Sequence, residues 1–234
     1  HSFPTRRSSD LKAEVCHANR ELVRRGLVTL TWGNASGISS DRTRVAIKPS
    51  GVAYDDLTPE RMVVVDLDGN VVEGRLRPSS DTPTHLLLYR SFEHIGGVAH
   101  THSPKATAFA QARLEIPCLG TTHADHFAGP VPVTRPLAAE EVEQEYERNT
   151  GKVIIERFMD LDSRAMPAVL VAGHGPFCWG GAALDSVATA AALEAVAAMA
   201  LATRLLRPES PVLEDYVRDR HFLRKHGPGA SYGQ

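Results

Sequence analysis

The sequence contains little cysteine, few aromatic residues and no large excess of charge of either sign. Three of its 234 residues are cysteine, an odd number without a C-x-x-C spacing, so we expect free thiols in a reducing compartment, the cytoplasm, rather than a disulfide framework. The formal net charge is −2, so the sequence lacks the excess of basic residues that is typical of a nucleic-acid-binding protein. The longest apolar stretch, 182–206, is interrupted by Asp185, Glu194 and Arg204, and it predicts a buried alanine-rich helix rather than a membrane span.

The first ten residues differ in character from the rest of the chain. HSFPTRRSSD has no apolar core of a secretory signal and fits no secondary-structure element, so we expect residues 1–10 to be a non-native or disordered leader. Hydrophobic residues make up 42% of the sequence and charged residues 23%, which is typical of a globular domain. We therefore expect residues 11–234 to form one domain with a sizeable core.

Hydrophobic periodicity predicts helices that alternate with short strands. The Asp68-Gly69 pair between two strands is a strong hairpin signal, which indicates that the early strands are antiparallel. We therefore expect a single-domain three-layer α/β/α sandwich around a mostly antiparallel sheet. Helices are expected at 11–26, from Asp81 through 89, and at 105–112, 138–147, 182–206 and 213–226; strands are expected at 27–32, 44–48, 62–66, 71–73, 96–102, 116–119 and 168–172.

Three histidines stand at or just past the ends of predicted strands. His100 and His102 alternate along one strand, so their side chains project to the same face. His174 follows another strand and lies between two glycines that leave its imidazole approachable. Three histidines are the number expected for a zinc site with an open position, although histidines in such places can also be purely structural. Asp81, in the first turn of its helix, could add an oxygen ligand or simply cap the helix.

A second group of residues suits an anion. Serine hydroxyls, backbone N–H groups and a helix N-terminus can bind a phosphate, and Lys48 would supply a point charge. Each segment could also be ordinary turn chemistry. No segment matches a P-loop or G-x-G-x-x-G, so neither ATP nor a dinucleotide is implied. The group consists of Gly33, Asn34, Lys48, Ser50, Gly51, Ser79 and Ser80.

The motifs taken together resemble the class II aldolase/epimerase superfamily, and within it the sugar-phosphate 4-epimerases, from about residue 11 to residue 234. The segments that carry the resemblance are LVTLTWGN, KPSG, PSSDTPTH, GGVAHTHS, GTTHAD, HGPF, LRKHG and the terminal YGQ. The resemblance implies one Zn²⁺ per subunit, with Mn²⁺ or Co²⁺ as substitutes. The implied metal ligands are Asp81, His100, His102 and His174, and the implied phosphate-binding residues are Asn34, Lys48, Ser50, Gly51, Ser79 and Ser80.

The same resemblance implies residues that exchange protons. Asp125, in GTTHAD, and Tyr232, in the C-terminal tail, correspond to acid/base residues, and His221 corresponds to a substrate-binding position. In the family, Asp125 and Tyr232 act in the site of a neighbouring subunit, so the resemblance implies a homotetramer with active sites at subunit interfaces. No nucleic acid or membrane is implied as a partner.

The implied reaction is the metal-dependent epimerisation of L-ribulose 5-phosphate to D-xylulose 5-phosphate, which could serve arabinose degradation, ascorbate use or another route. C4 is β to the carbonyl, so its hydrogen is not activated, and oxidation at C4 would need a nicotinamide site. Retro-aldol cleavage of C3–C4, rotation of glycolaldehyde phosphate and aldol re-addition avoid both problems. A zinc ion would act as the Lewis acid for the enediolate fragment.

Three other hypotheses are weighed against this one. A class II aldolase acting on fuculose or rhamnulose phosphate would typically carry Glu where this chain has Asp81. A metal-free binding module on the same fold would be expected to have lost metal ligands, yet all are present. A cupin-type dioxygenase also uses H-x-H but would carry a Glu a few residues later, and residues 103–107 contain none.

Overall fold

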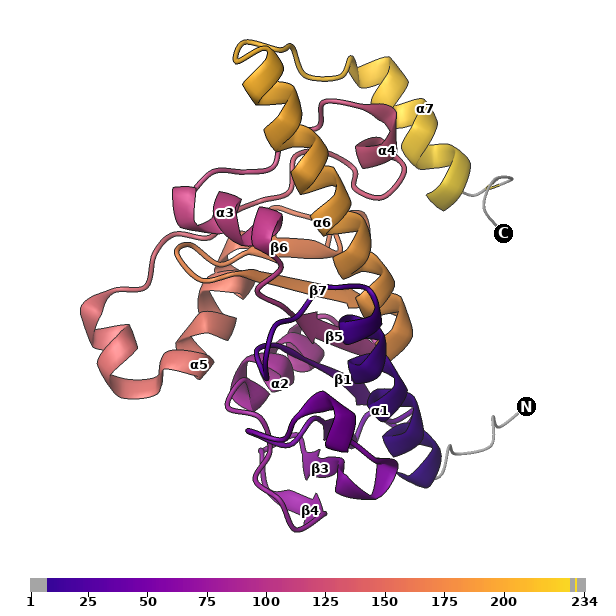
Figure 1. The fold of residues 1–234 in the computed structure, drawn as a ribbon, viewed down its shortest axis with the longest axis vertical. Helices are drawn as coiled ribbons and strands as arrows, with labels where there is room; N and C mark the ends of the chain where they lie inside the picture. The colour runs from indigo at the N-terminus through magenta and orange to yellow at the C-terminus, as the bar shows by residue number, and fades with distance from the viewer. Residues whose placement is uncertain (1–7, 228–229, 231–234) are drawn as a thin grey trace.

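Within residues 8–227, seven strands form one antiparallel sheet through the middle of the molecule (Figure 1). The computed structural model describes residues 8–227 and residue 230. The strands are β1 (Asn34–Ile38), β2 (Arg44–Ile47), β3 (Val63–Asp66), β4 (Val71–Glu73), β5 (Gly97–His100), β6 (Ala168–Leu170) and β7 (Pro176–Gly180). Their order across the sheet is β4-β3-β2-β1-β5-β7-β6, and every neighbouring pair runs antiparallel.

Helices cover both faces of this sheet. The helices are α1 (Ser8–Arg24), α2 (Thr82–Ser91), α3 (Pro104–Ala112), α4 (Thr121–Ala124), α5 (Ala139–Arg157), α6 (Ala183–Leu206) and α7 (Asp215–His226), with short 3₁₀ turns η1 (Tyr54–Asp56) and η2 (Pro59–Arg61). On one face, α1 packs on β1 and α6 packs on β5 and β7. On the other, Ser36 of β1 hydrogen-bonds to His85 at 2.7 Å and Tyr89 at 2.8 Å, both on α2, and α5 packs on α2. The predicted three-layer α/β/α sandwich is confirmed.

Helix α6 is long and apolar enough to cross a membrane by length and composition alone. In the structure it lies against β5, β7, α1 and α3, and residues such as Val187, Leu193 and Ala197 are buried in the core. The core helix of a soluble protein passes the same test, and the packing of α6 agrees with the predicted buried alanine-rich helix.

The first predicted strand is wrong. Residues 27–32 form no strand, because Leu30 adopts a φ of +53° and lies in a turn. The strand is instead β1, at residues where no strand was predicted. Its small side chains suit a central strand, since a Cβ on Gly37 would lie only 3.0 Å from a methyl group of Val15 on α1. Pairing with β2 and β5 and contact with α1 thus outweigh the β propensity of the preceding segment.

Other boundaries also differ from the prediction. The strand expected at 116–119 is reduced to an isolated bridge between Ile116 and Val131. Strand β7 (Pro176–Gly180) was not predicted. Residues 120–126, where no helix was predicted, contain α4, and α5 extends ten residues beyond Glu147 to Arg157. The predicted hairpin at Asp68-Gly69 is confirmed as the link between β3 and β4.

Residues 1–10 were predicted to be a leader outside the domain. Of the predicted leader, Ser8, Ser9 and Asp10 form the first turn of α1, and the Ser8 hydroxyl donates to Glu73. Residues 1–7 lie outside the described residues. The non-native origin of the leader therefore stays a prediction.

Candidate active site

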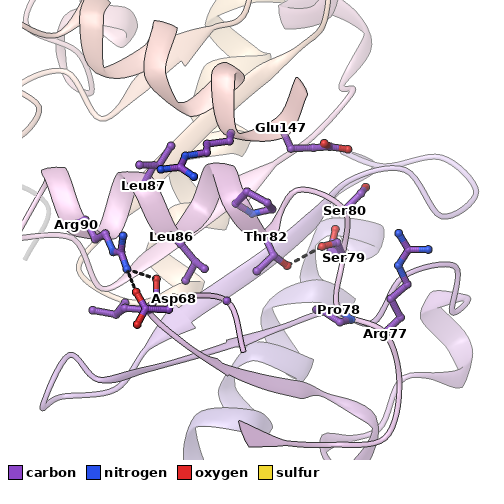
Figure 2. Close-up of a pocket in the computed structure, with 14 residues that line it drawn as sticks. Asp68, Arg77, Pro78, Ser79, Ser80, Thr82, Leu86, Leu87, Arg90 and Glu147 are labelled. Carbon is purple, nitrogen blue, oxygen red and sulfur yellow. Dashed lines mark hydrogen bonds and ion pairs between the residues drawn. The ribbon is translucent and has the colours of Figure 1, made fainter. Parts of the chain in front are cut away.

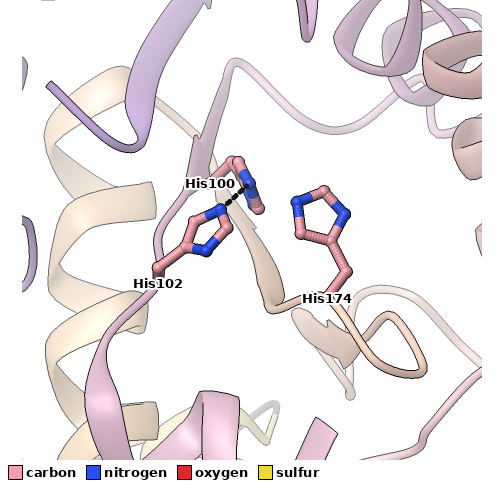
Figure 3. A group of neighbouring side chains, drawn as sticks. All are labelled: His100, His102 and His174. Atoms are coloured by element: carbon pink, nitrogen blue, oxygen red, sulfur yellow. Dashed lines mark hydrogen bonds between the residues drawn. The ribbon is translucent and has the colours of Figure 1, made fainter. Parts of the chain in front are cut away.

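Three histidines from two parts of the chain meet at one point (Figure 3). His100 ends β5, His102 follows it, and His174 lies in the turn between β6 and β7. One ring nitrogen from each lies within 4.8 Å of the others, and the ring centroids are 4.8–5.0 Å apart. The structure thus brings the three predicted histidines together in a group that could hold a metal ion.

The arrangement of the ring nitrogens suits a metal ion. His100 Nδ1 is 2.9 Å from the carbonyl oxygen of Pro176, so it donates its proton there and leaves the Nε2 lone pair free. The ring of His100 also stacks on Phe177, with centroids 4.2 Å apart. His100 Nε2 faces His102 Nε2 at 3.1 Å. Nitrogens bound to a tetrahedral Zn²⁺ lie about 3.3 Å apart, so these residues fit a metal ion of that kind.

The turn that carries His174 is fixed by its backbone. Val171 and Gly175 are joined by a hydrogen bond of 2.9 Å, and His174 N–H donates to the Val171 carbonyl at 3.0 Å. A Cβ on Gly175 would lie 2.8 Å from the Thr101 carbonyl oxygen, so only glycine lets the turn approach the β5 end this closely. The His174 ring is partly exposed, and its Nδ1 lies 3.2 Å from the Tyr146 hydroxyl.

Asp81 lies beside this cluster rather than inside it. Its carboxylate accepts a hydrogen bond of 2.7 Å from the Asn34 amide and is not among the groups whose ligand atoms lie within 4.8 Å of one another. Burial raises the pKa of Asp81, but the attraction of His100 and His85 and the Asn34 hydrogen bond outweigh it, and the net shift is downward. Asp81 is therefore an ionised carboxylate at the edge of the histidine cluster, in the position from which an oxygen ligand could come.

The predicted anion-binding residues line the same cleft as the histidines. The cleft has a volume of about 560 Å³. Its two serine-containing loops are held side by side, because Ser50 N–H donates to the Arg77 carbonyl at 2.9 Å and Ser79 N–H donates to the Lys48 carbonyl at 3.0 Å. The lining includes all predicted members of the group: Gly33, Asn34, Lys48, Ser50, Gly51, Ser79 and Ser80, together with Asp81, His100, His102 and His174.

Lys48 is the cation of this cleft. Its side chain is buried, with a relative exposure of 2%, and its ammonium lies 4.9 Å from the centre of the Tyr54 ring and 3.3 Å from the Pro49 carbonyl oxygen. Burial lowers the pKa of Lys48. Among the described residues no carboxylate forms an ion pair with it. An anionic ligand in the cleft would supply the missing counter-charge.

A second pocket, of about 620 Å³, shares Ser79, Ser80 and Glu147 with the cleft (Figure 2). Of the three arginines that line it, Arg90 is already bonded to the Asp68 carboxylate at 2.5 Å and to the Leu67 carbonyl at 2.6 Å. None of the three clustered histidines lines it. The candidate chemistry therefore lies in the cleft with the histidines.

Asp125 and His221 meet each other but do not line the cleft. Asp125 follows α4, and its carboxylate lies 3.1 Å from His221 Nδ1 and 2.9 Å from the Arg224 guanidinium, both on α7. Burial raises the pKa of Asp125, and the hydrogen bonds from His221 and Arg224 outweigh it, so the pKa falls below its usual value. Helices α4 and α7 lie together at the end of the molecule opposite β3 and β4 (Figure 1). Tyr232 lies outside the described residues.

Three residues of the site escaped the sequence analysis. Tyr146 and Glu147 line the cleft from α5, and Arg224 holds Asp125. The acidic stretch around Glu147 resembles an ordinary solvated helix face, so no local pattern marks it. Arg224 lies in the LRKHG segment, but nothing in its spacing connects it with a residue 99 positions earlier.

The family is shown by comparison with known proteins. The chain is 55% identical over 224 residues to L-ribulose-5-phosphate 4-epimerase UlaF of Salmonella paratyphi B, which covers 96% of this chain and 98% of the relative; the identity to the protein of that name from Salmonella typhi is the same. Among solved structures it is similar to an L-fuculose 1-phosphate aldolase, with a TM-score of 0.78 and 28% identity over 92% of this chain and 95% of the other. The family model named Class II Aldolase and Adducin N-terminal domain matches residues 13–201, and the chain therefore belongs to the class II aldolase family.

Proposed function

We propose that the protein converts L-ribulose 5-phosphate to D-xylulose 5-phosphate by inverting the configuration at C4. The observation that carries the proposal is one cleft in which the histidine cluster faces the serine- and lysine-containing loops. The choice of substrate is supported by the near full-length relatives, which are named L-ribulose-5-phosphate 4-epimerase. The proposed location of the protein is the cytoplasm.

The loops of the cleft would hold the 5-phosphate. The Lys48 ammonium would neutralise one phosphate charge, and Asn34 would orient Ser79, to whose hydroxyl oxygen its amide already donates at 3.1 Å. The remaining donors would be the hydroxyl and backbone N–H groups of Ser50, Gly51 and Ser80. Because these groups bind the phosphate rather than the reacting carbons, they would keep the C4–C5 fragment in place while it turns.

The histidine cluster would hold one Zn²⁺ per subunit, with Asp81 as the fourth ligand and Mn²⁺ or Co²⁺ as possible substitutes. When bound, the ion supplies Lewis-acid stabilisation of negative charge on the C2 and C3 oxygens of the sugar. The histidines contribute fixed, neutral nitrogen donors, since burial lowers the pKa of His102 and lowers that of His174 to about 3. Asp81 contributes a negative charge that makes the site bind a divalent ion rather than a neutral molecule.

The protons would be exchanged by residues of a neighbouring subunit. Cleavage of C3–C4 requires a base for the C4 hydroxyl proton, and re-addition from the other face of the aldehyde requires an acid on that side. We assign these roles to Asp125 and Tyr232. Asp125 does not line the cleft of its own chain, which supports a homotetramer in which the α4–α7 end of one subunit completes the cleft of the next.

A class II aldolase is the second candidate, because one of the similar solved structures is an L-fuculose 1-phosphate aldolase. The two reactions share the carbon–carbon cleavage and differ in its outcome. An aldolase releases the aldehyde fragment, whereas an epimerase retains it until the bond re-forms. Release of glycolaldehyde phosphate therefore separates the two candidates.

The test is conversion of L-ribulose 5-phosphate by the purified protein, before and after chelation and after addition of Zn²⁺. We expect conversion that is lost with chelator and restored by the metal. His100→Ala should lose metal and activity together, whereas His17→Ala, an exposed position on α1, serves as the matched control and should keep both. Full activity of the metal-free protein would contradict the proposal, and release of glycolaldehyde phosphate without epimerisation would identify an aldolase.

A further inference from the structure

Helix α5 is broken in its middle. Glu145 has φ −144° and ψ 65°, which no α-helix accommodates, so residues 139–144 and 146–157 form two arms that meet at an angle. Neither Pro nor Gly lies at the break, which are the usual causes of a sharp kink. The break must therefore be held by contacts of neighbouring side chains.

Asn149 supplies the main contact. Its side chain is buried, and its amide donates to the carbonyl oxygen of Glu141 at 2.8 Å. Residues eight apart in a straight helix are separated by about 12 Å along the axis, so this bond cannot form without the kink. On the second arm, Thr150 donates to the Tyr146 carbonyl at 2.9 Å, and Thr84 of α2 donates to the Glu147 carbonyl.

The kink carries Tyr146 to His174. The Tyr146 hydroxyl lies 3.2 Å from His174 Nδ1, and the two rings have centroids 6.0 Å apart. Of the three clustered histidines, His100 is already fixed by the Pro176 carbonyl and by stacking on Phe177. His174 lies in a turn flanked by glycines, and Tyr146 provides its side-chain hydrogen bond.

We propose that Tyr146 is a positioning residue for His174, and that Asn149 holds Tyr146 in place through the kink of α5. This inference rests on the proposed metal site. The Tyr146 oxygen accepts the proton of His174 Nδ1, which fixes the ring and its tautomer and directs Nε2 toward the facing Nε2 atoms of His100 and His102. A histidine that binds a metal normally donates its other N–H to such a partner, and loss of the partner typically weakens metal binding about 10- to 100-fold.

The test measures metal affinity of the full chain rather than turnover. Zn²⁺ affinity is determined by competition with a chelator, and the Co²⁺-loaded protein gives an absorption spectrum that reports ligand geometry. Tyr146→Phe removes only the hydroxyl, and we expect it to weaken Zn²⁺ binding about 10- to 100-fold and to change the Co²⁺ spectrum, with the melting temperature of the metal-free protein unchanged. Tyr216→Phe, on the exposed surface of α7, is the matched control and should change neither.

A second variant acts through the kink. Asn149→Asp keeps the size of the side chain but cannot donate to the Glu141 carbonyl, and it leaves the Tyr146 hydroxyl in the protein. We expect it to weaken Zn²⁺ binding in the same direction. If Tyr146→Phe does not fold, this variant decides the question.

The outcomes separate the inference from the proposal beneath it. If His100→Ala abolishes metal binding but Tyr146→Phe keeps the wild-type Zn²⁺ affinity and Co²⁺ spectrum, Tyr146 has no positioning role. If Tyr146→Phe does not fold, the same result in Asn149→Asp overturns the inference. If His100→Ala still binds Zn²⁺ with wild-type affinity, the proposed metal site itself is wrong.

Discussion

Replacing Lys48 by methionine separates the effect of this buried charge on stability from its effect on phosphate binding. The ammonium is buried against Tyr54 and the Pro49 carbonyl, and burial lowers its pKa. If it binds the phosphate, its loss removes one charge-assisted hydrogen bond worth about 1.5–3 kcal/mol. That free energy corresponds to an increase in KM for L-ribulose 5-phosphate of about 10- to 150-fold.

The free protein should lose little stability in the same variant. Lys48→Met gives up a cation–π contact with Tyr54 that is worth about 2 kcal/mol for a desolvated ammonium, but it also removes the desolvation cost of that ammonium. Methionine has a similar length and fills the same space. We therefore expect the free energy of unfolding in urea to stay within about 1 kcal/mol of wild type or to rise.

Steady-state kinetics and urea denaturation of Lys48→Met test both halves of the argument. Lys105→Met, at an exposed position at the start of α3, is the control and should change neither KM nor stability. An unchanged KM would remove Lys48 from the phosphate site. A loss of stability above about 2 kcal/mol, the size expected for a packed core residue, would show that the side chain has a structural role instead.

Two further predictions concern Asp125 and His123. Asp125→Asn should abolish epimerisation while Zn²⁺ affinity is kept. Mixing this variant with His100→Ala should restore part of the activity, because about a quarter of the sites in a random mixed oligomer would have both residues intact. No recovery after confirmed subunit exchange would contradict sites shared between subunits. Burial lowers the pKa of His123 to about 4 from 6.5, so the unfolded state binds more protons between those two pH values and stability is lost as the pH falls. Through this group alone the free energy of unfolding should fall by about 2 kcal/mol from pH 7.5 to pH 5; His123→Gln should flatten that slope in urea denaturation, and an equal slope in both proteins would show that His123 does not titrate in this way.

The histidine cluster was within reach of sequence analysis because each of its members carries a local signal. His100 and His102 show the alternation of a strand, and the glycines on both sides of His174 mark a tight turn. The structure adds the distance between the two segments, which depends on β5 pairing with β7. That pairing was not predicted, since no strand was assigned to the residues of β7.

The errors of the prediction come from tertiary contacts that outweigh local preference. Residues 27–32 are rich in strand-forming side chains, yet β1 forms from the smaller residues that follow, because α1 approaches the sheet closely there. Tyr146 shows the same limit at the site. Its approach to His174 depends on a kink that is made by a hydrogen bond between Asn149 and Glu141, and nothing in the sequence pattern of an acidic helix indicates such a bond.

The position of Asp125 links the architecture to the chemistry that we propose. Inverting C4 requires protein groups on two opposite faces of the aldehyde carbon, and Asp125 does not line the cleft of its own chain. Asp125 is held ionised by His221 and Arg224 before any substrate arrives, and it stands at the α4–α7 end rather than in its own cleft. The hydrogen bonds from His221 and Arg224 lower the pKa of Asp125, so the carboxylate is ionised and able to accept a proton, and they hold it in one orientation. In the proposed homotetramer, the α4–α7 end of a neighbouring subunit would bring this oriented group to the second face of the substrate.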